Sequence, residues 1–195
     1  MASSRATPSN KREAFLVPIK QFDLAKDRLR QGGVRDAARV AEQLARGVIA
    51  SAAPQTVIVV CESDRVRDFA MELGVRVHES NATTLNEAVT VAYEHLGNEF
   101  DRLLIVHSDL RSPQGLGEFV PGPGITIVTD HRRDGTNLLV VPTRLEFRFS
   151  YGRGSRLAHE IEANRLGLEC AVVFDSPWAY DIDEPRDLDF DPDAR

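Results

Sequence analysis

The segment "TVIVVCESDRVRDFAMELGVRVHE", residues 56–79, decides the fold class of this 195-residue chain. Its first part, Thr56–Cys61, is mostly β-branched and does not alternate with polar residues, which is typical of a strand covered on both faces. An amphipathic helical pattern follows, with Ser63 or Asp64 as its cap and Gly74 at its end. The closing "VRVHE" has the character of a second strand. A strand, a helix and a strand in this order predict a parallel βαβ unit.

The same alternation of apolar runs and helical patterns continues on both sides of this unit. Thr84 and Glu87 form a capping-box pattern at the start of one helix, and a final helical turn is expected from Pro185. Further strands are expected at residues 14–19, 101–110, 124–130, 136–142, 168–174 and 179–183, and further helices at residues 36–51, 83–97 and 154–167. This rhythm predicts an α/β protein with a mostly parallel central sheet.

Length and composition indicate one globular domain, residues 14–190, between a disordered leader, residues 1–13, and an acidic tail, residues 191–195. The leader lacks the apolar core of a secretion signal, and no apolar run is long enough to span a bilayer. Net charge is −6, which argues against a nucleic-acid partner. The two cysteines, Cys61 and Cys170, have no CxxC spacing and are expected to be reduced and buried. We therefore expect a cytoplasmic protein with no membrane or nucleic-acid partner.

Ligands of open parallel sheets bind beyond the carboxyl ends of the strands, and this rule selects the residues to consider. The polar residues at expected strand ends are Lys20, Asp109, Asp130, Asp181 and Asp183. Neither GxxxxGK[ST] nor GxGxxG follows the first strand. The chain is therefore neither a P-loop NTPase nor a standard dinucleotide-binding protein.

Three cations follow the first expected strand closely: Lys20, Lys26 and Arg28 in "VPIKQFDLAKDRLR". Lysine supplies a point charge to phosphate and arginine a bidentate fork, so the loop could hold a polyphosphate. The alternative is a basic turn that only faces water.

Carboxylates follow two other expected strands. Asp109 in "HSDL" could hold Mg²⁺, which takes hard oxygen ligands and few protein carboxylates; the alternative is a helix cap. Asp181 and Asp183 in "YDIDEP" are two residues apart, so a strand would place both on one face. Two carboxylates on one face repel unless a cation lies between them, which makes a metal plausible. The alternative is that one of them caps the turn before Pro185.

Two later segments carry glycine and hydroxyl residues. In "TDHRRDGTNLLVVP" the "DG" pair predicts a tight turn between strands, just before Thr136 and Asn137. In "FRFSYGRGSRLAH", Gly152 and Gly154 allow close approach of the backbone to a ligand, and Ser155 opens a helix. The free amides of a helix N-terminus attract anions, so a phosphate or carboxylate would fit there; the alternative is a plain helix start.

Taken together, these segments resemble the CofC/FbiD family, over roughly Phe15 to Leu188. The resemblance is carried by "VPIKQFDLAKDRL", "TLNEAV", "HSDL", "TDHRRDGTNLLVVP", "FRFSYGRGSRLAH" and "DIDEPRDL". It implies a Rossmann-like nucleotidyltransferase fold similar to the GT-A class. It also implies a guanylyltransferase of deazaflavin coenzyme F420 biosynthesis, which joins GTP to phosphoenolpyruvate or 2-phospho-L-lactate and releases pyrophosphate.

The resemblance also implies roles for individual residues. The implied roles are GTP phosphate binding and catalysis for Lys20, Lys26 and Arg28, nucleoside contact for Asn86, Mg²⁺ binding for Asp109, Asp183 and Asp181, and acceptor binding for Thr136, Gly152 and Ser155. The expected partners are thus GTP and a small phospho-acid, with Mg²⁺ as cofactor.

Three alternatives stay open at this point. One is a non-catalytic nucleotide-binding protein, although a basic loop together with an acidic metal site favours an enzyme. Another is a guanylyltransferase that uses 3-phosphoglycerate. The third is a glycosyltransferase on the same fold, but such enzymes usually carry a DxD motif in mid-chain, where this sequence has only "HSDL".

Overall fold

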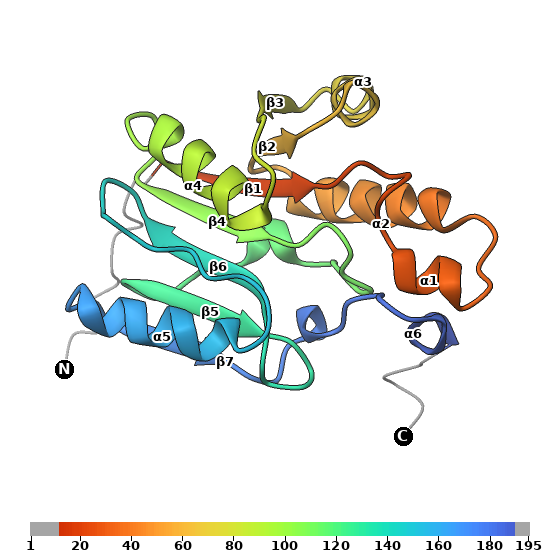
Figure 1. Ribbon diagram of the computed structural model, residues 1–195. Coiled ribbons are helices and arrows are strands. Elements are labelled where there is room, and N and C mark those ends of the chain that lie inside the picture. The colour runs from red at the N-terminus through yellow and green to blue at the C-terminus, as the bar shows by residue number, and fades with distance from the viewer. Residues whose placement is uncertain (1–11, 190–195) are drawn as a thin grey trace.

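The apolar runs form one sheet, and the amphipathic segments cover it on both faces (Figure 1). The computed structural model describes residues 12–189. The seven strands lie in the order β3-β2-β1-β4-β6-β5-β7. Their bounds are Glu13–Ile19 (β1), Thr56–Cys61 (β2), Arg76–Glu79 (β3), Arg102–Val106 (β4), Ile125–Thr129 (β5), Thr136–Pro142 (β6) and Cys170–Val173 (β7). Only β6 runs antiparallel to its neighbours, β4 and β5, so the prediction of a mostly parallel α/β sheet is confirmed.

Helices connect most of the strands. They are Asp27–Gln31 (α1), Ala37–Ala52 (α2), Asp64–Glu72 (α3), Leu85–Leu96 (α4), Ser155–Arg165 (α5) and Pro185–Asp189 (α6), with short 3-10 turns at Leu116–Glu118 (η1) and Pro177–Ala179 (η2). The expected boundaries agree with these to within a few residues, and α6 begins at Pro185 as predicted.

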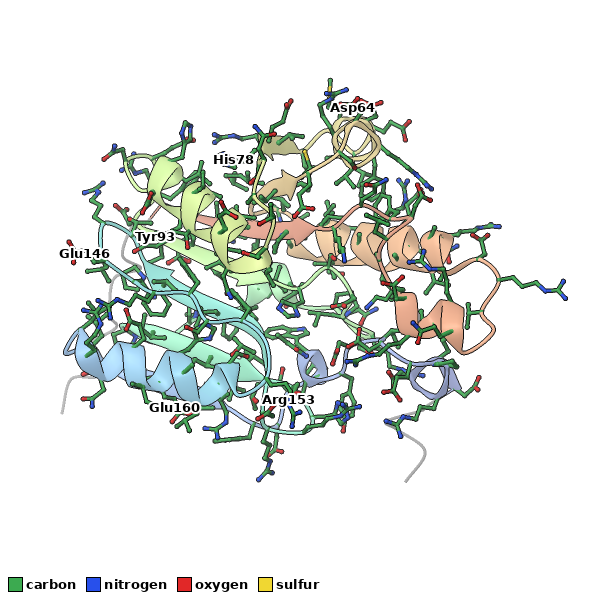
Figure 2. All side chains as sticks on the ribbon, in the orientation of Figure 1. Asp64, His78, Tyr93, Glu146, Arg153 and Glu160 are labelled. Atoms are coloured by element: carbon green, nitrogen blue, oxygen red, sulfur yellow. The ribbon has the colours of Figure 1, made fainter. Side chains whose placement is uncertain are left out.

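Strand β1 shows why the central strands read as continuous apolar runs. Phe15 and Val17 belong to the apolar cluster that includes α2 and α3, whereas Ala14 and Leu16 belong to the cluster that includes α4. Successive side chains of a strand point to opposite faces, so a strand with a helix layer on each side has no solvent-facing position. Figure 2 shows Tyr93 between α4 and the sheet, where its hydroxyl donates a hydrogen bond to the carbonyl of Pro142 at 2.6 Å.

The helix caps follow the sequence closely. Ser63 Oγ accepts a hydrogen bond from the amide of Val66 at 3.4 Å and begins α3. Thr84 Oγ1 accepts from the amide of Glu87 at 3.3 Å and begins α4. The reciprocal bond of the predicted capping box is shifted by one residue, because Glu87 Oε2 accepts from the amide of Thr83 rather than of Thr84.

Two expectations about the C-terminal part are wrong. Residues 179–183 do not form a strand: they make one isolated antiparallel bridge, between Asp181 and Leu110. The η2 turn ends at Ala179 and α6 begins at Pro185, so the extended segment between them is too short to form a ladder of β-sheet hydrogen bonds. Cys170 is exposed rather than buried, because β7 is an edge strand; Cys61 is buried, and both thiols are free.

The ends of the expected domain fall near the limits of the described residues. The acidic tail, residues 191–195, and all of the expected leader except Arg12 and Glu13 lie outside them. Glu13 already belongs to β1, one residue before the expected start of the domain. Among the helices within residues 12–189, none is both long enough and apolar enough to cross a membrane.

Candidate active site

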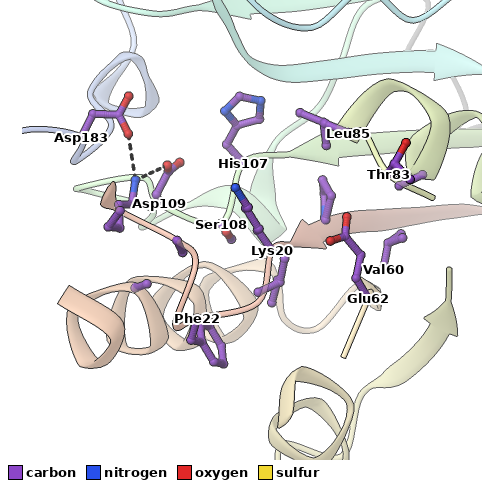
Figure 3. Close-up of a pocket in the computed structure, with 16 residues that line it drawn as sticks. Lys20, Phe22, Val60, Glu62, Thr83, Leu85, His107, Ser108, Asp109 and Asp183 are labelled. Atoms are coloured by element: carbon purple, nitrogen blue, oxygen red, sulfur yellow. Dashed lines mark hydrogen bonds and ion pairs between the residues drawn. The ribbon is translucent and has the colours of Figure 1, made fainter. Parts of the chain in front are cut away.

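A cavity of about 430 Å³ opens at the carboxyl ends of β1, β2 and β4 (Figure 3). This is the edge of the sheet where the sequence placed the ligand. The residues that matter for its chemistry are Lys20, Lys26, Glu62, Thr83, His107, Ser108, Asp109 and Asp183. Apolar side chains, among them Val60, Leu85 and Ala88, form the remaining wall.

Lys26 is the best-buried charge of this cavity. Its ammonium lies 2.5 Å from Asp109 Oδ2 and 3.0 Å from Asp183 Oδ1, and its side chain is only 7% exposed. The residue caps α1 in the left-handed backbone region, with φ of 60°, which costs free energy for a side chain of this kind. The short helix α1 thus directs a lysine inward, and Lys26 bridges two acidic residues that are far apart in the sequence.

The charges of this bridge stabilise one another. Burial by itself lowers the pKa of Lys26, yet the nearby charges of Asp109 and Asp183 outweigh it and hold that pKa above the ordinary value. Burial likewise opposes ionisation of Asp109, but the ammonium of Lys26, together with His107, holds the pKa of Asp109 below its usual value. At neutral pH Lys26 is therefore a cation and Asp109 an anion.

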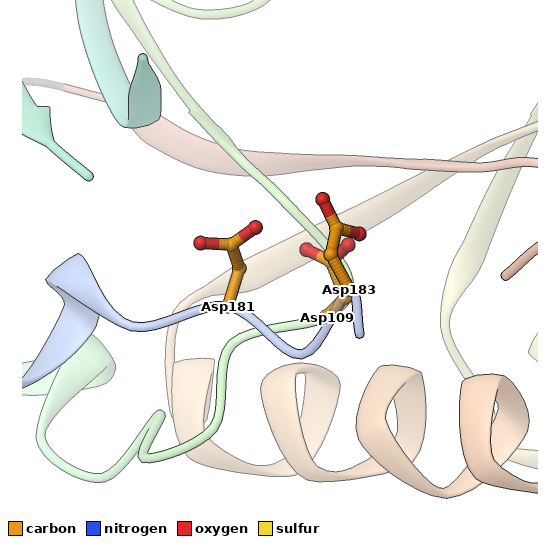
Figure 4. Close-up of side chains that lie close together, drawn as sticks. All are labelled: Asp109, Asp181 and Asp183. Carbon is orange, nitrogen blue, oxygen red and sulfur yellow. The ribbon is translucent and has the colours of Figure 1, made fainter. Parts of the chain in front are cut away.

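Asp181 completes an acidic cluster with Asp109 and Asp183, and the three offer carboxylate oxygens within 4.8 Å of one another (Figure 4). The cluster forms because the extended segment before α6 pairs with the residues after β4: the amide of Ile182 donates to the carbonyl of Asp109 at 3.0 Å. Burial, then the charges of Asp109 and Asp183, raise the pKa of Asp181 to about 6. Such a set of oxygen ligands can hold a metal ion.

The other two predicted cations differ from Lys26. Lys20 follows β1 directly, is exposed, lines the cavity, and within residues 12–189 makes no hydrogen bond or ion pair. Arg28 lies in α1 outside the cavity lining, and its guanidinium is 3.8 Å from Asp183 Oδ2 with a side chain 64% exposed. The predicted basic loop is therefore part loop and part helix, and all three cations lie close to the acidic cluster or the cavity.

Asn86 does not face the cavity. Its side-chain oxygen accepts from the amide of Tyr151 at 2.6 Å, and its amide nitrogen donates to the carbonyl of the same residue at 3.3 Å. Both polar ends thus hold the segment before α5 against the start of α4, and contact between Asn86 and a nucleoside stays a prediction.

The residues predicted to hold the acceptor lie beside the cavity rather than in its lining. Thr136 and Ser155 are brought together, with their hydroxyl oxygens 3.3 Å apart, but the residues are only 2% and 1% exposed. Gly152 is exposed, has φ of 121°, and has open space where a side chain would stand. Their contact with an acceptor stays a prediction.

The turn between β5 and β6 is tied to the start of α5. The turn lies at residues 130–133, just before the "DG" pair where it was expected, because the amide of Arg133 donates to the carbonyl of Asp130 at 2.9 Å. Asp130 Oδ1 accepts hydrogen bonds from the amides of Asp134 and Gly135. Asp134 in turn accepts from the amide of Gly154 with its side chain and from the amide of Arg156 with its carbonyl. The amides proposed for an anion at this helix start therefore already have protein acceptors.

Sequence reasoning did not single out Glu62, Thr83 and Ser108, which line the cavity. Glu62 could have been found, because it is the first residue after β2 and the rule on strand ends applies to it as it does to Lys20. His107 packs against Tyr151, with ring centroids 5.5 Å apart, as expected for a packed histidine. Its buried Nε2, however, has no hydrogen-bond partner within residues 12–189.

Comparison with known proteins gives matches along nearly the whole chain. A family model described as "Guanylyl transferase CofC like" matches residues 13–190. The phosphoenolpyruvate guanylyltransferase of Thermobaculum terrenum is 27% identical over 185 residues, 90% of this chain and 80% of that one. The 2-phospho-L-lactate guanylyltransferase of Ferroglobus placidus is 32% identical over 176 residues, 88% and 80% of the two chains. A 3-phospho-D-glycerate guanylyltransferase of Colwellia psychrerythraea is 29% identical over 139 residues, 68% and 66%.

Solved structures resemble the fold at much lower identity. A nucleotidyl transferase from Methanothermobacter superposes with a TM-score of 0.63 at 18% identity, covering 92% of this chain and 94% of that one. At this identity the likeness concerns the fold, and it agrees with the nucleotidyltransferase-like sheet expected from the sequence.

Proposed function

The chain belongs to the family of CofC-like guanylyl transferases, and on this premise we propose that it joins GTP to a three-carbon phospho-acid and releases pyrophosphate. The relatives support this reaction class, since they are named for guanylyl transfer to phosphoenolpyruvate, 2-phospho-L-lactate or 3-phospho-D-glycerate. Of these acceptors we propose phosphoenolpyruvate, and we assign the reaction to the biosynthesis of the deazaflavin coenzyme F420, as the family resemblance implies.

One observation carries the proposal: a single cavity contains both charge types that a nucleotidyl transfer needs. Lys20 and Lys26 line it as cations, and Asp109 and Asp183 line it as anions. Cations stabilise the phosphates of a nucleotide, whereas carboxylates alone would repel them. A cleft with both can hold a nucleotide together with a divalent cation.

The acidic cluster fits a divalent cation such as Mg²⁺. Asp109 Oδ1 is buried and has no hydrogen-bond partner within the described part of the chain, so a hard cation would satisfy an acceptor that is otherwise unpaired. Asp109 and Asp183 would hold the ion, with Asp181 beside them. When bound, the ion would neutralise charge on the reacting phosphates.

The reaction requires the protein to position the two substrates and to stabilise charge, and it requires no general base. An oxygen of the acceptor phosphate attacks the α-phosphorus of GTP, a new P–O bond forms, and the bond from the α-phosphorus to the bridging oxygen breaks to release pyrophosphate. A phosphate dianion is itself a nucleophile, so no side chain must remove a proton. Lys20 and Lys26 in the cavity, with Arg28 near Asp183, would stabilise the charge that develops on the leaving group.

For the acceptor we propose contacts to Thr136, Gly152 and Ser155. Support comes from their location: Thr136 begins β6, next to β4, whose end carries Asp109, and Gly152 and Ser155 begin the segment that enters α5. The acceptor would thus approach the acidic cluster from the β6 side, and the nucleotide from the β1 side.

The test is a pyrophosphate-release assay on the purified chain with Mg²⁺. It crosses GTP, ATP, CTP and UTP with phosphoenolpyruvate, 2-phospho-L-lactate and 3-phosphoglycerate. We expect release above background with GTP and phosphoenolpyruvate, and little with the other nucleotides. Release with GTP and another acid would replace the proposed acceptor and keep the reaction class. No release with any of the twelve pairs, together with measurable GTP binding, would replace the enzyme by a nucleotide-binding protein.

A further inference from the structure

We propose that Glu62 selects the base of the nucleotide, by accepting hydrogen bonds from the two adjacent donors that guanine presents. The inference rests on the proposed function, because it takes the cavity as the GTP site. It adds a residue that determines specificity and that sequence reasoning did not single out.

The position of Glu62 follows from the order of the strands. Lys20 follows β1, Glu62 follows the neighbouring β2, and Asp109 lies beyond the end of β4 on the other side of β1. Two strand spacings of about 4.8 Å put the ends of β2 and β4 on the order of 10 Å apart. Figure 3 shows Glu62 on the far side of Lys20 from Asp109 and Asp183. A nucleotide with its phosphates at the acidic cluster and Lys20 therefore extends its base toward Glu62.

Glu62 also lacks a partner inside the protein. Within residues 12–189 its carboxylate makes no hydrogen bond and no ion pair, although the neighbouring acids Asp23 and Asp64 each have an arginine partner. Ile19 pairs with Cys61 at the ends of β1 and β2, so Lys20 and Glu62 are the next residues after the two strands. Lys20 nevertheless makes no ion pair with Glu62. The cavity thus has an unpaired cation and, beyond it, an unpaired anion, which suits a ligand with an anionic end and a hydrogen-bond donor end.

The wall between these charges suits a flat aromatic ring. Val60 and Ala88 are buried apolar residues that line the cavity, and Leu85 at the first position of α4 lines it as well. Thr83 forms the polar rim nearby, with its hydroxyl directed to Glu87. An apolar wall gives affinity for any base, so discrimination must come from the polar group at its edge, which is Glu62.

The chemistry of the bases makes a carboxylate selective for guanine. An ionised carboxylate can only accept hydrogen bonds, through two oxygens. Guanine presents N1–H and the 2-amino group side by side, so both oxygens find a donor. Adenine and cytosine present one amino group beside a ring nitrogen that itself accepts, and uracil presents one N–H between two carbonyls. Charge-assisted bidentate pairs are the strong ones, and a mismatched acceptor against the carboxylate is repelled.

The experiment measures binding, so it does not depend on turnover. GTP, ITP and ATP, each with Mg²⁺, compete with a fluorescent GTP analogue for the wild-type chain and for Glu62→Gln. ITP keeps N1–H and lacks the 2-amino group. We expect the wild type to prefer GTP over ATP by about tenfold to hundredfold, with ITP between them. In Glu62→Gln the preference for GTP over ATP should fall close to parity, mainly because GTP binds more weakly.

Control variants separate this role from a general effect of charge. Glu72→Gln removes an exposed carboxylate on α3 that does not line the cavity, and it should leave the ratio of affinities unchanged. Glu62→Asp keeps the charge on a shorter side chain and should keep part of the preference; it replaces Glu62→Gln if that variant does not fold. Equal affinities in the wild type, an unchanged ratio in the Glu62 variants, or loss of the preference in the control Glu72→Gln would overturn the inference. If selectivity depends on Glu62 but no acid yields pyrophosphate, the proposed reaction fails and the inference stands.

Discussion

Two clusters of polar side chains lie at the same edge of the sheet and are built on opposite principles. The first, the acidic cleft, consists of Lys26, Asp109, Asp181 and Asp183 beside the cavity. The second, the His159 network, lies where α5 meets β6 and consists of His159, Thr136 and Ser155. The first is charged, and its Asp109 Oδ1 has no hydrogen-bond partner in the described range 12–189. The second is neutral and gives His159 a partner at each ring nitrogen.

The His159 network has one consistent arrangement of protons. His159 Nε2 accepts from the amide of Ser150 at 3.1 Å, so the ring proton is on Nδ1 and is donated to Thr136 Oγ1, also at 3.1 Å. Ser155 Oγ donates to the same oxygen at 3.3 Å. Neutral groups with protein partners therefore hold the backbone here, whereas in the acidic cleft Asp109 Oδ1, which has no partner within residues 12–189, is available for a ligand.

The largest effect should come from the acidic cleft. Asp109→Asn removes one charge while keeping the shape of the side chain, and we expect turnover to fall by about a thousandfold, because charge stabilisation in a buried site is the main catalytic contribution. The measurement is pyrophosphate release with GTP and phosphoenolpyruvate, alongside the thermal midpoint of unfolding, which checks that the variant folds although Lys26 loses one of its two carboxylate partners. Asp175→Asn, in a side chain that is 95% exposed, is the matched control and should retain full activity. Unchanged pyrophosphate release in Asp109→Asn would contradict the metal assignment.

A smaller loss is expected from Lys26→Met, which keeps the length of the side chain and removes its charge. Asp109 and Asp183 then repel each other without a cation between them, and phosphate loses one of its nearby cations, so we expect kcat/KM for GTP to fall by about a hundredfold. Lys20 remains in the cavity and limits the loss. Lys26→Arg restores the charge and should recover part of the activity. Full activity in Lys26→Met would show that the bridge is structural only.

The His159 network should affect the pH dependence of the free energy of unfolding rather than turnover. Burial, together with the charge of His107, lowers the pKa of His159 from 6.5 to about 4. Below pH 6.5 the ring is protonated in the unfolded chain, whereas in the folded chain it stays neutral down to about pH 4. The contribution of His159 to the free energy of unfolding is therefore present in full above pH 6.5 and is lost as pH falls toward 4. Between pH 7.5 and pH 5 this removes about 2 kcal/mol from the free energy of unfolding.

Chemical denaturation of the wild type and of His159→Gln at these two pH values measures this contribution. The variant lacks the titrating ring, so its loss of stability between pH 7.5 and pH 5 should be smaller by the same amount. Identical pH dependence in the two proteins would show that His159 is protonated in the folded state or that its surroundings are not buried.

Ser155→Ala should have the smallest effect on stability. The lost hydrogen bond to Thr136 is long, and Thr136 keeps its bond from His159, so we expect a cost of about 1 kcal/mol in the free energy of unfolding. The same variant tests the acceptor assignment: if Ser155 touches the phospho-acid, KM for that acid rises while KM for GTP stays constant. A change in stability without any change in either KM would confine Ser155 to the network.

Most of the secondary structure could be predicted, because burial and local spacing carry it. Thr56–Cys61 and Thr136–Pro142 match the expected strands residue for residue, since each contains an unbroken apolar run, residues 57–61 and 138–142. The strand predicted at residues 179–183 is wrong, because the same alternating pattern also fits an extended segment that pairs at only one residue. Strand order depends on contacts between distant segments and has no local signal, whereas the antiparallel pairing of β6 with β5 follows from the turn that joins them.

For the site, residue types and their order along the chain establish which chemistry is present: cations after the first strand, carboxylates after the fourth and near the C-terminus, and the family to which they point. How these groups meet follows from the packing of distant segments. Lys26 and Asp183 are 157 residues apart, and their contact at 3.0 Å exists because α1 and the segment before α6 both end at the carboxyl edge of one sheet. The same folding gave Asn86 and Thr136 partners inside the protein, whereas the carboxylate of Glu62 has no hydrogen bond or ion pair within residues 12–189. Residue type fixes what a group can do, but its partners, and hence its availability to a ligand, are set by which distant segments pack beside it.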